Sequence, residues 1–326
     1  MTTTIIDVGQ KRTRTPGRRL PSVHRRPPRA PRPPKRTPPP PRERAPLSPT
    51  VVLVRSSFTV LALLLLAFVL NVTVFSQIQH VVAQQQLANE FREELVAGTA
   101  PVSEGDFNDH LLADGAPLGI LSIPSIGVRE VFIEGTSADT MKNGPGHRRD
   151  TVLPGQVGVS VLLGRAAAFG GPFGRIQELA PGDTFSIRTG QGESVFTVIG
   201  VRYAGDPAPA APTLKQSRLI LETARGASFA PDGVAYVDAQ AAAKPAGARQ
   251  TTFLALPSED KPMASDVSTV WALVFALQFM VIAEIAAVWS YRKLGAQKTW
   301  VVFVPVTILA VLFVTNQVTI LLPNLL

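Results

Sequence analysis

The sequence predicts an all-β domain set between membrane-spanning helices. Between Leu118 and about Leu256, short apolar runs rich in Val, Ile, Phe and Thr alternate with turn residues about every 8–12 positions, which is typical of a β-barrel or sandwich. On both sides of this region, long apolar stretches lack charge, as membrane spans do. The composition agrees, because 45% hydrophobic and 17% charged residues is apolar for a soluble protein.

Residues 1–50 are predicted to form a disordered, basic, Pro-rich cytoplasmic tail. They hold 13 of the 29 prolines, and 13 Lys and Arg against only Asp7 and Glu43, so they cannot bury enough apolar area to fold. The segment could simply fix the orientation of the protein in the membrane, attract anionic lipid, or bind another protein through its polyproline II runs. The pI near 10.2 therefore describes a tail, and no nucleic-acid partner is predicted.

A first transmembrane helix is predicted within residues 51–76. The run from Ser56 to Phe75 is uncharged and begins just after Arg55. At 1.5 Å per residue it spans about 30 Å, the thickness of the hydrocarbon core. Residues 77–117 then read as a stalk helix, free of Gly and Pro as far as Val96, followed by a linker.

Two more transmembrane helices are predicted at residues 267–289 and 300–322. The loop between them contains Arg292, Lys293 and Lys298 and no acid. By the positive-inside rule, the tail and this loop are cytoplasmic, whereas the β domain and the C-terminus are extracytoplasmic. The cell membrane is thus the predicted location, and membrane lipid a predicted partner.

Polar residues inside the spans are interpreted mainly as structural. Glu284 lies close enough to the cytoplasmic end of its span to reach the interface or pair with Lys293. Gln278, Asn316 and Gln317 can hydrogen-bond between helices, and Pro305 should kink the last span near its start. We expect no pore or proton relay from this pattern.

Several kinds of chemistry are excluded or unsupported. The chain has no cysteine, which removes disulfides, thiolate metal ligands and any thiol nucleophile. We predict no metal and no cofactor, because no dinucleotide or phosphate-binding glycine motif is present. The histidines also lack metal-ligand spacing; they are His24, His80, His110 and His147.

The β domain, predicted at residues 118–257, resembles the sortases, membrane-anchored cysteine transpeptidases of Gram-positive surfaces. The similarity is to the housekeeping, class E-like sortases of high-GC bacteria and covers about residues 118–240. It implies an eight-stranded β-barrel. Four ordered blocks carry the resemblance: Leu121 to His147, Thr151 to Gly164, Phe169 to Gly200, and Arg218 to Ala224.

All three catalytic positions of the family are changed in this sequence. Arg165 follows Gly164 where the family has its catalytic His, and Thr223-Ala224 stands for the family's Thr-Cys. The stretch from Asp232 to Ala239 contains no Arg, although the family's catalytic Arg belongs there. Sortase chemistry needs a thiolate nucleophile, an imidazole acid and a cation for the oxyanion. Alanine is no nucleophile, and arginine stays protonated.

No catalytic residue is therefore assigned, but four residues are candidates for binding in the cleft: Arg165, Thr223, Arg225 and His147. Thr223 would need a base to act as a nucleophile, and His147 lies in a turn that is non-catalytic in the family. Arg165 and Arg225 could be solvated, or could form a cationic pair that binds a carboxylate or an acidic peptide. The loop from Gly205 to Pro212 is either a lid or a plain connector.

Three functions remain open on this basis. The leading hypothesis is an inactive sortase-like scaffold or binding subunit that contacts an extended peptide, or another membrane or cell-wall protein. The second is an active transpeptidase or hydrolase that uses a nucleophile other than Cys. The third is a structural membrane component whose barrel serves as a spacer.

Overall fold

The computed structural model describes residues 48–105, 110–245, 256–265, 267 and 270–326. Contacts divide the chain into residues 1–48 and residues 49–326, and the description below concerns the second unit. The predicted disordered tail, residues 1–50, thus lies almost wholly outside the described residues.

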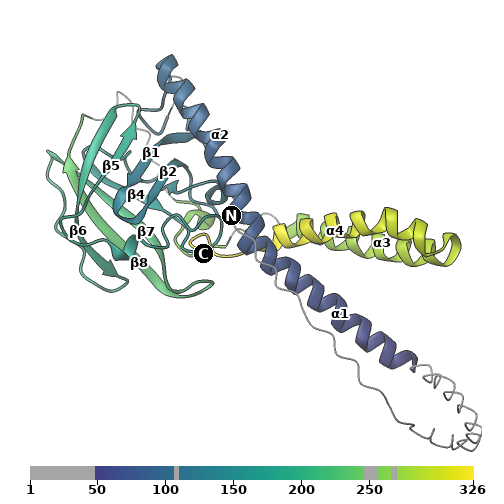
Figure 1. Cartoon of the computed structure of the whole chain (residues 1–326). Coiled ribbons are helices and arrows are strands. Elements are labelled where there is room, and N and C mark those ends of the chain that lie inside the picture. Colours follow the sequence, from purple (N-terminus) through teal and green to yellow (C-terminus); the bar gives the residue numbers. More distant parts are fainter. Residues whose placement is uncertain (1–47, 106–109, 246–255, 266, 268–269) are drawn as a thin grey trace, which may run out of the picture. The chain divides into compact units, whose positions relative to one another are not determined.

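Eight strands close into a barrel (Figure 1). Their order around the barrel is β1-β2-β3-β4-β7-β8-β6-β5, so the predicted eight-stranded barrel is confirmed. The all-β class holds only for this domain, because with its long helices the chain as a whole is mixed α and β. The strands are β1 (Pro117–Ile123), β2 (Val128–Glu134), β3 (Gly146–His147), β4 (Gly158–Leu163), β5 (Thr184–Thr189), β6 (Gly192–Tyr203), β7 (Gln216–Ala227) and β8 (Ala230–Ala242).

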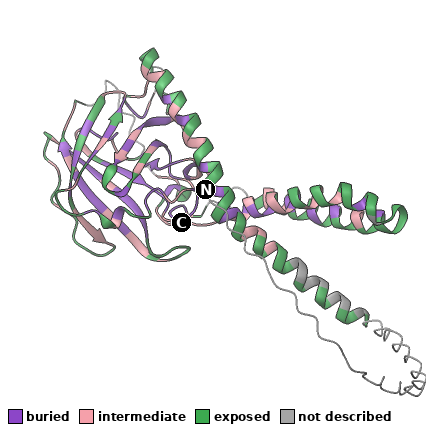
Figure 2. Ribbon diagram, viewed as in Figure 1, coloured by how far each residue is buried: buried purple, intermediate pink, exposed green. Residues whose placement is uncertain are grey.

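Alternating side chains explain why these segments form strands. Along β6, Phe196 and Val198 are buried, whereas the neighbouring Val195 is 61% exposed. The Phe185 and Phe196 rings stack with centroids 5.7 Å apart inside a core that draws on every long strand. Two-residue periodicity directs one set of side chains inward and the other outward. Figure 2 shows the buried residues running along the strands.

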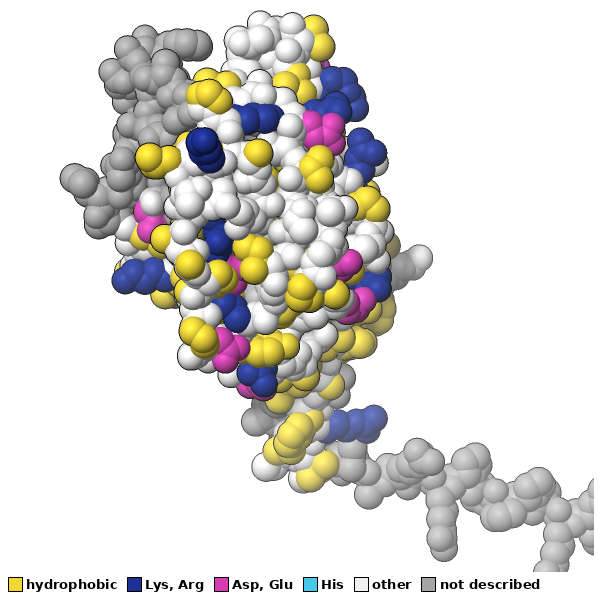
Figure 3. Space-filling model, turned by 90° about the vertical axis from the view of Figure 1, so that its left-hand side faces the viewer, with side chains coloured by type: hydrophobic (Ala, Val, Ile, Leu, Met, Phe, Trp, Pro, Cys, Tyr) yellow, Lys and Arg dark blue, Asp and Glu magenta, His cyan; other side chains and the backbone are white. Residues whose placement is uncertain are grey.

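The outer face of the barrel carries no concentrated patch in the view of Figure 3. Single hydrophobic side chains there are interspersed with Lys or Arg and with Asp or Glu. Scattered apolar residues of this kind are ordinary for a protein surface. This face therefore offers no obvious binding surface.

Three helices are long and apolar enough to cross a membrane: Leu61–Ala97, Val270–Leu294 and Gln297–Ile320. The first combines α1 (Pro49–Leu70), a π-helical turn (Asn71–Phe75) and α2 (Ser76–Ala97), and ends at Gly98 in the left-handed conformation, a common helix terminator. The others correspond to α3 (Val270–Leu294) and α4 (Ala296–Ile320), which form a hairpin. Much of the apolar surface of these helices is exposed (Figure 2).

Specific contacts join the helices to one another and to the barrel. The Asn71 amide, in the π-helical turn, donates to the Thr315 hydroxyl of α4 at 2.9 Å. The Gln84 side chain of α2 donates to the Val131 carbonyl and accepts from the Val131 amide of β2. Bidentate bonding of this kind fixes α2 against the edge of the barrel wall.

Within the α3/α4 hairpin, small and flexible side chains fill the interface, among them Ala276, Met280 and Ala310. Glu284 is exposed on the surface of the hairpin. Lys293 lies over the Trp289 ring, 5.1 Å from its centre. Pro305 lies inside α4.

Candidate functional site

The two segments predicted to carry the site lie side by side. Strands β4 and β7 pair in parallel, with Leu163 opposite Glu222. The Gly164 amide donates to the Glu222 carbonyl, and the Thr223 hydroxyl donates to the Gly164 carbonyl, both at 2.9 Å. We call the region formed by Gly164–Phe169 and Thr223–Arg225 the cleft.

Ala224 is buried at the base of the cleft. Only 5% of its surface is exposed, and it packs in a cluster with Met141, Val161 and Leu163. Strand β7 continues past Ala224 to Ala227, because its hairpin with β8 remains paired as far as Ala230. A methyl group in an apolar cluster offers no nucleophile.

Arg165 is buried rather than solvated, with 1% of its surface exposed. Its Nη2 donates to the Ala138 carbonyl at 2.7 Å, and its guanidinium lies 4.9 Å from the centre of the Phe169 ring. Burial lowers the pKa of Arg165 to about 10, although Asp139 nearby opposes this shift. The residue therefore remains a cation at neutral pH, bound mainly to main-chain oxygen.

The loop after β4 is shaped by close packing. A Cβ atom at Gly164 would lie 2.3 Å from the Phe173 ring, so only glycine fits there. Phe169 adopts a positive φ of 49°, and its amide donates to the Ser76 hydroxyl at the start of α2. The loop is thus anchored on the helix that continues from the first apolar span.

The last residues of the sequence occupy the cleft. We call Pro323–Leu326 the strap; it is a tight turn closed by the Leu326 amide and the Pro323 carbonyl. The Ala166 amide donates to the Leu325 carbonyl at 2.9 Å, and the Ala168 amide to the Leu326 carbonyl at 3.1 Å. Leu325 is fully buried in the same cluster as Ala224.

The strap leaves little free space in the cleft. The cavity that remains measures about 50 Å³ and is bordered by Ala224, Arg225 and Leu326. The loop from Gly205 to Pro212 does not border it; its Ala210 carbonyl accepts from Arg218 instead. The segment that covers the cleft is therefore the strap and not the loop considered as a lid.

Arg225 has different surroundings from Arg165. Its side chain is 49% exposed, its Nε lies 3.7 Å from Asp232, and its guanidinium lies 4.4 Å from the centre of the Tyr203 ring. One arginine is thus held inside the protein by carbonyl groups, whereas the other lies at the surface beside an acid.

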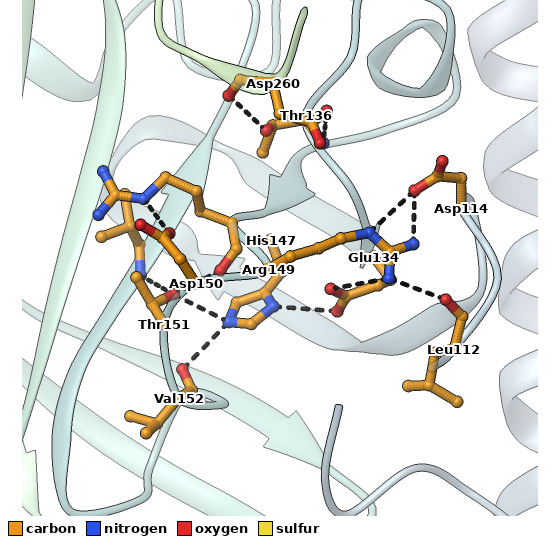
Figure 4. Close-up of polar contacts among 12 residues, drawn as sticks. Leu112, Asp114, Glu134, Thr136, His147, Arg149, Asp150, Thr151, Val152 and Asp260 are labelled. Atoms are coloured by element: carbon orange, nitrogen blue, oxygen red, sulfur yellow. Dashed lines mark hydrogen bonds and ion pairs between the residues drawn. The ribbon is translucent and has the colours of Figure 1, made fainter. Parts of the chain in front are cut away.

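His147 belongs to a buried charged cluster (Figure 4). Its Nδ1 lies 3.0 Å from Glu134, and both side chains are fully buried. Arg149 is 3.8 Å from Glu134 and bonds Asp114 through Nε at 3.1 Å. Burial lowers the pKa of His147, but the Glu134 carboxylate more than offsets it, so the net pKa is raised.

Thr151 completes a hydroxyl–imidazole–carboxylate row with His147 and Glu134. The Thr151 hydroxyl lies 3.2 Å from Nε2 of His147. The same Nε2 is 3.0 Å from the Val152 carbonyl, which can only accept, so this nitrogen carries a proton. A protonated nitrogen cannot take a proton from Thr151, and the row therefore lacks a general base.

A larger groove of about 450 Å³ lies between α2 and the barrel. Apolar side chains of α2 line it together with Ile120 and Val131, and Arg129 and Arg188 also border it. None of its lining residues belongs to the cleft. It is separate from the residues that the sequence analysis selected.

Sequence reasoning missed both the strap and the cluster. No local motif tells which surface a short apolar segment such as Pro323–Leu326 covers. Glu134 was missed because a single acid in an apolar strand has no partner until the strand pairing brings it to His147.

Comparison with known proteins supports the assignment of the domain. A family model described as "Sortase domain" matches residues 121–228. Sortase D of Bacillus subtilis (strain 168) is 32% identical over 111 residues, which is 33% of this chain and 54% of that protein. The chain thus spans about half the length of this curated relative.

Solved structures of sortases are also similar. A sortase D transpeptidase of Clostridium perfringens is 19% identical, with a TM-score of 0.39 over 49% of this chain and 98% of that chain. Sortase A of Corynebacterium diphtheriae is 15% identical, with a TM-score of 0.36 over 53% and 96% of the two chains. Residues 121–228 thus match the sortase-domain model, and the chain has no cysteine, the residue on which sortase chemistry depends.

Proposed function

We propose that this protein is a catalytically inactive, class E-like sortase that acts as a membrane-bound scaffold or peptide-binding subunit at the cell surface. In this proposal the barrel is extracytoplasmic and contacts a short peptide or another membrane or cell-wall protein. Separating binding from chemistry is physically straightforward, because the two use different parts of a site.

One observation carries the proposal. At the position that resembles the nucleophile, Ala224 is packed against Leu325 in an apolar cluster. At the position that resembles the catalytic His, Arg165 is buried and donates to main-chain carbonyl groups. The site is thus built from groups that bind and pack, and its centre is closed to a substrate carbonyl.

A non-Cys nucleophile is the alternative, and the row of Thr151, His147 and Glu134 does not support it. Its imidazole is fully buried and donates from the nitrogen nearest the hydroxyl. Thr223 is equally unsuited, because its buried hydroxyl donates to the Gly164 carbonyl. Neither hydroxyl has the base that attack on a peptide carbonyl requires.

The membrane topology forms part of the proposal. Arg292, Lys293 and Lys298 lie at or near the tip of the α3/α4 hairpin, so the positive-inside rule places this tip in the cytoplasm. The strap then emerges on the same side as the barrel, as its contacts with Ala166 and Ala168 require. Three spans, where an anchor needs one, favour lateral association with another membrane protein.

Two experiments on the full-length protein test this function. Incubated in detergent with a sortase-type peptide and an amine nucleophile, it should release no product and form no acyl-enzyme under conditions where a Cys-containing sortase is active. Turnover would overturn the proposal. Mild crosslinking in native membranes, followed by mass spectrometry, should recover a stoichiometric partner; recovery of the protein alone would favour the spacer alternative.

A further inference from the structure

The strap contacts the cleft in the way a bound peptide would. Two successive carbonyl groups, of Leu325 and Leu326, accept from the amides of Ala166 and Ala168. Main-chain bonds of this kind bind a peptide whatever its side chains, and pockets for side chains then add specificity. The cleft therefore already shows how a peptide fits it.

A single apolar pocket selects the side chain. Leu325 is fully buried against Met141, Leu163 and Ala224, with Met263 beside it. The small side chain at Ala224 leaves room for a leucine at this point, since close-packed interiors hold no spare volume for a larger residue. An aliphatic side chain is the group that this pocket accepts.

Arg165 provides the polar half of the recognition. Its Nη1 donates to the Leu326 carbonyl at 3.5 Å, and its buried Nε has no hydrogen-bond partner among the described residues. If the strap leaves, this buried cation loses an acceptor, so an incoming carbonyl oxygen is favoured.

Asn324 anchors the other end of the strap. Its side-chain amide donates to the carbonyl groups of Thr136 and Lys261, and its main-chain amide donates to that of Ala264. These contacts tie the strap to the segment that leads from the barrel to α3. The contacts at Asn324 are thus separate from those of Leu325 and Leu326.

We propose that the cleft is an exchangeable peptide-binding site whose resting occupant is the strap. This rests on the function proposed above. Its ligand is a short apolar peptide with an aliphatic side chain that replaces Leu325 and a carbonyl group that replaces that of Leu326 at Arg165. The strap inhibits this binding, because a tether of two residues, Leu321 and Leu322, holds it near the cleft at an effective concentration of about millimolar.

The test uses the full-length protein in detergent and a fluorescein-labelled, C-terminally amidated peptide with the sequence of residues 321–326. Wild type should bind the peptide at least tenfold more weakly than the Leu325→Asp variant, in which a buried carboxylate drives the strap out. Hydrogen exchange at the Ala166 and Ala168 amides should speed up in Leu325→Asp and slow again when the peptide is added. Adding Arg165→Met to this variant should weaken peptide binding at least tenfold.

Two further variants serve as controls. Leu214→Asp places the same charge on a leucine that is 86% exposed, and should match wild type. Ala224→Phe fills the leucine pocket, so it should speed up exchange at both amides and still bind no peptide. This second variant tests the pocket even if Leu325→Asp fails to fold.

Each outcome has a distinct meaning. Unchanged exchange in both Leu325→Asp and Ala224→Phe overturns the exchangeable strap. Faster exchange without peptide binding in Leu325→Asp overturns the ligand assignment and leaves the inactive scaffold standing. Cleavage of the bound peptide would instead overturn the proposed function.

Discussion

Two of the buried arginines, Arg149 and Arg165, have different surroundings. Arg149 lies beside two carboxylates, of Asp114 and Glu134, in a cluster built from the barrel wall and the loops that join its strands. Arg165, in the cleft, donates to two main-chain oxygens, and one of these belongs to the strap. The difference indicates that the cluster is completed by the sortase-family domain and its linker, whereas the cleft is completed by a segment from the far end of the chain.

The cluster should be the more sensitive of the two regions. Replacing Glu134 by Ala leaves His147 and Arg149 buried without their shared acid. We expect a loss of about 3–5 kcal/mol in the free energy of unfolding, the usual cost of removing one partner from a buried ion pair. Urea titration of the full-length protein in detergent, followed by circular dichroism and by hydrogen exchange in β4, measures this loss.

The matched control is Glu193→Ala. Glu193 pairs with Arg188 at 3.5 Å on the surface, where solvent screening leaves an ion pair little effect on stability. Equal losses for the two variants would show that the cluster does not stabilise the barrel.

Stability should also fall as the pH rises from 5 to 8. Burial raises the pKa of Glu222 to about 7, although Arg148 and Arg202 oppose this shift. The folded state therefore binds the Glu222 proton more tightly than the unfolded chain does. The resulting contribution to the free energy of unfolding is complete below pH 4.5 and is lost as the pH rises through 7. The shift corresponds to about 3 kcal/mol, and the raised pKa of His147 acts in the same direction.

Unfolding free energies at several pH values, for wild type and Glu222→Gln, measure this dependence. In Glu222→Gln, the free energy of unfolding should no longer fall as steeply between about pH 5 and pH 7, because an amide does not titrate. A variant that keeps the full slope would assign the dependence to other groups.

The smallest change in the free energy of unfolding is expected for a substitution in the cleft. In Thr223→Val the Gly164 carbonyl loses one donor, which should cost about 1 kcal/mol without changing any activity. Thr184→Val, at an exposed position of β5, is the control. Peptide turnover by wild type that Thr223→Val abolishes would instead identify Thr223 as a nucleophile.

Periodicity and motif order were sufficient to predict the barrel. Neighbouring residues along a strand, such as Val195 and Phe196, alternate between exposed and buried. This alternation can be recognised in the sequence without any knowledge of tertiary contacts. The change from Cys to Ala224 is likewise visible in one residue.

The state of each charged side chain depended on distant partners. The sequence left Arg165 either solvated or part of a cationic pair with Arg225. Its burial depends on Phe169 and on Leu326, 161 positions away. His147 was placed in a turn, but the parallel pairing of β2 with β3 brings it to Glu134.

The sequence by itself therefore determined the β-barrel domain, the apolar helices on either side of it and the absence of a thiol. Only the tertiary structure decided that the cleft is filled, and by which segment. The physical reason is that strand and helix patterns are local, whereas a four-residue apolar segment such as Pro323–Leu326 fits many surfaces equally well until the fold presents two free amides and a leucine pocket beside it.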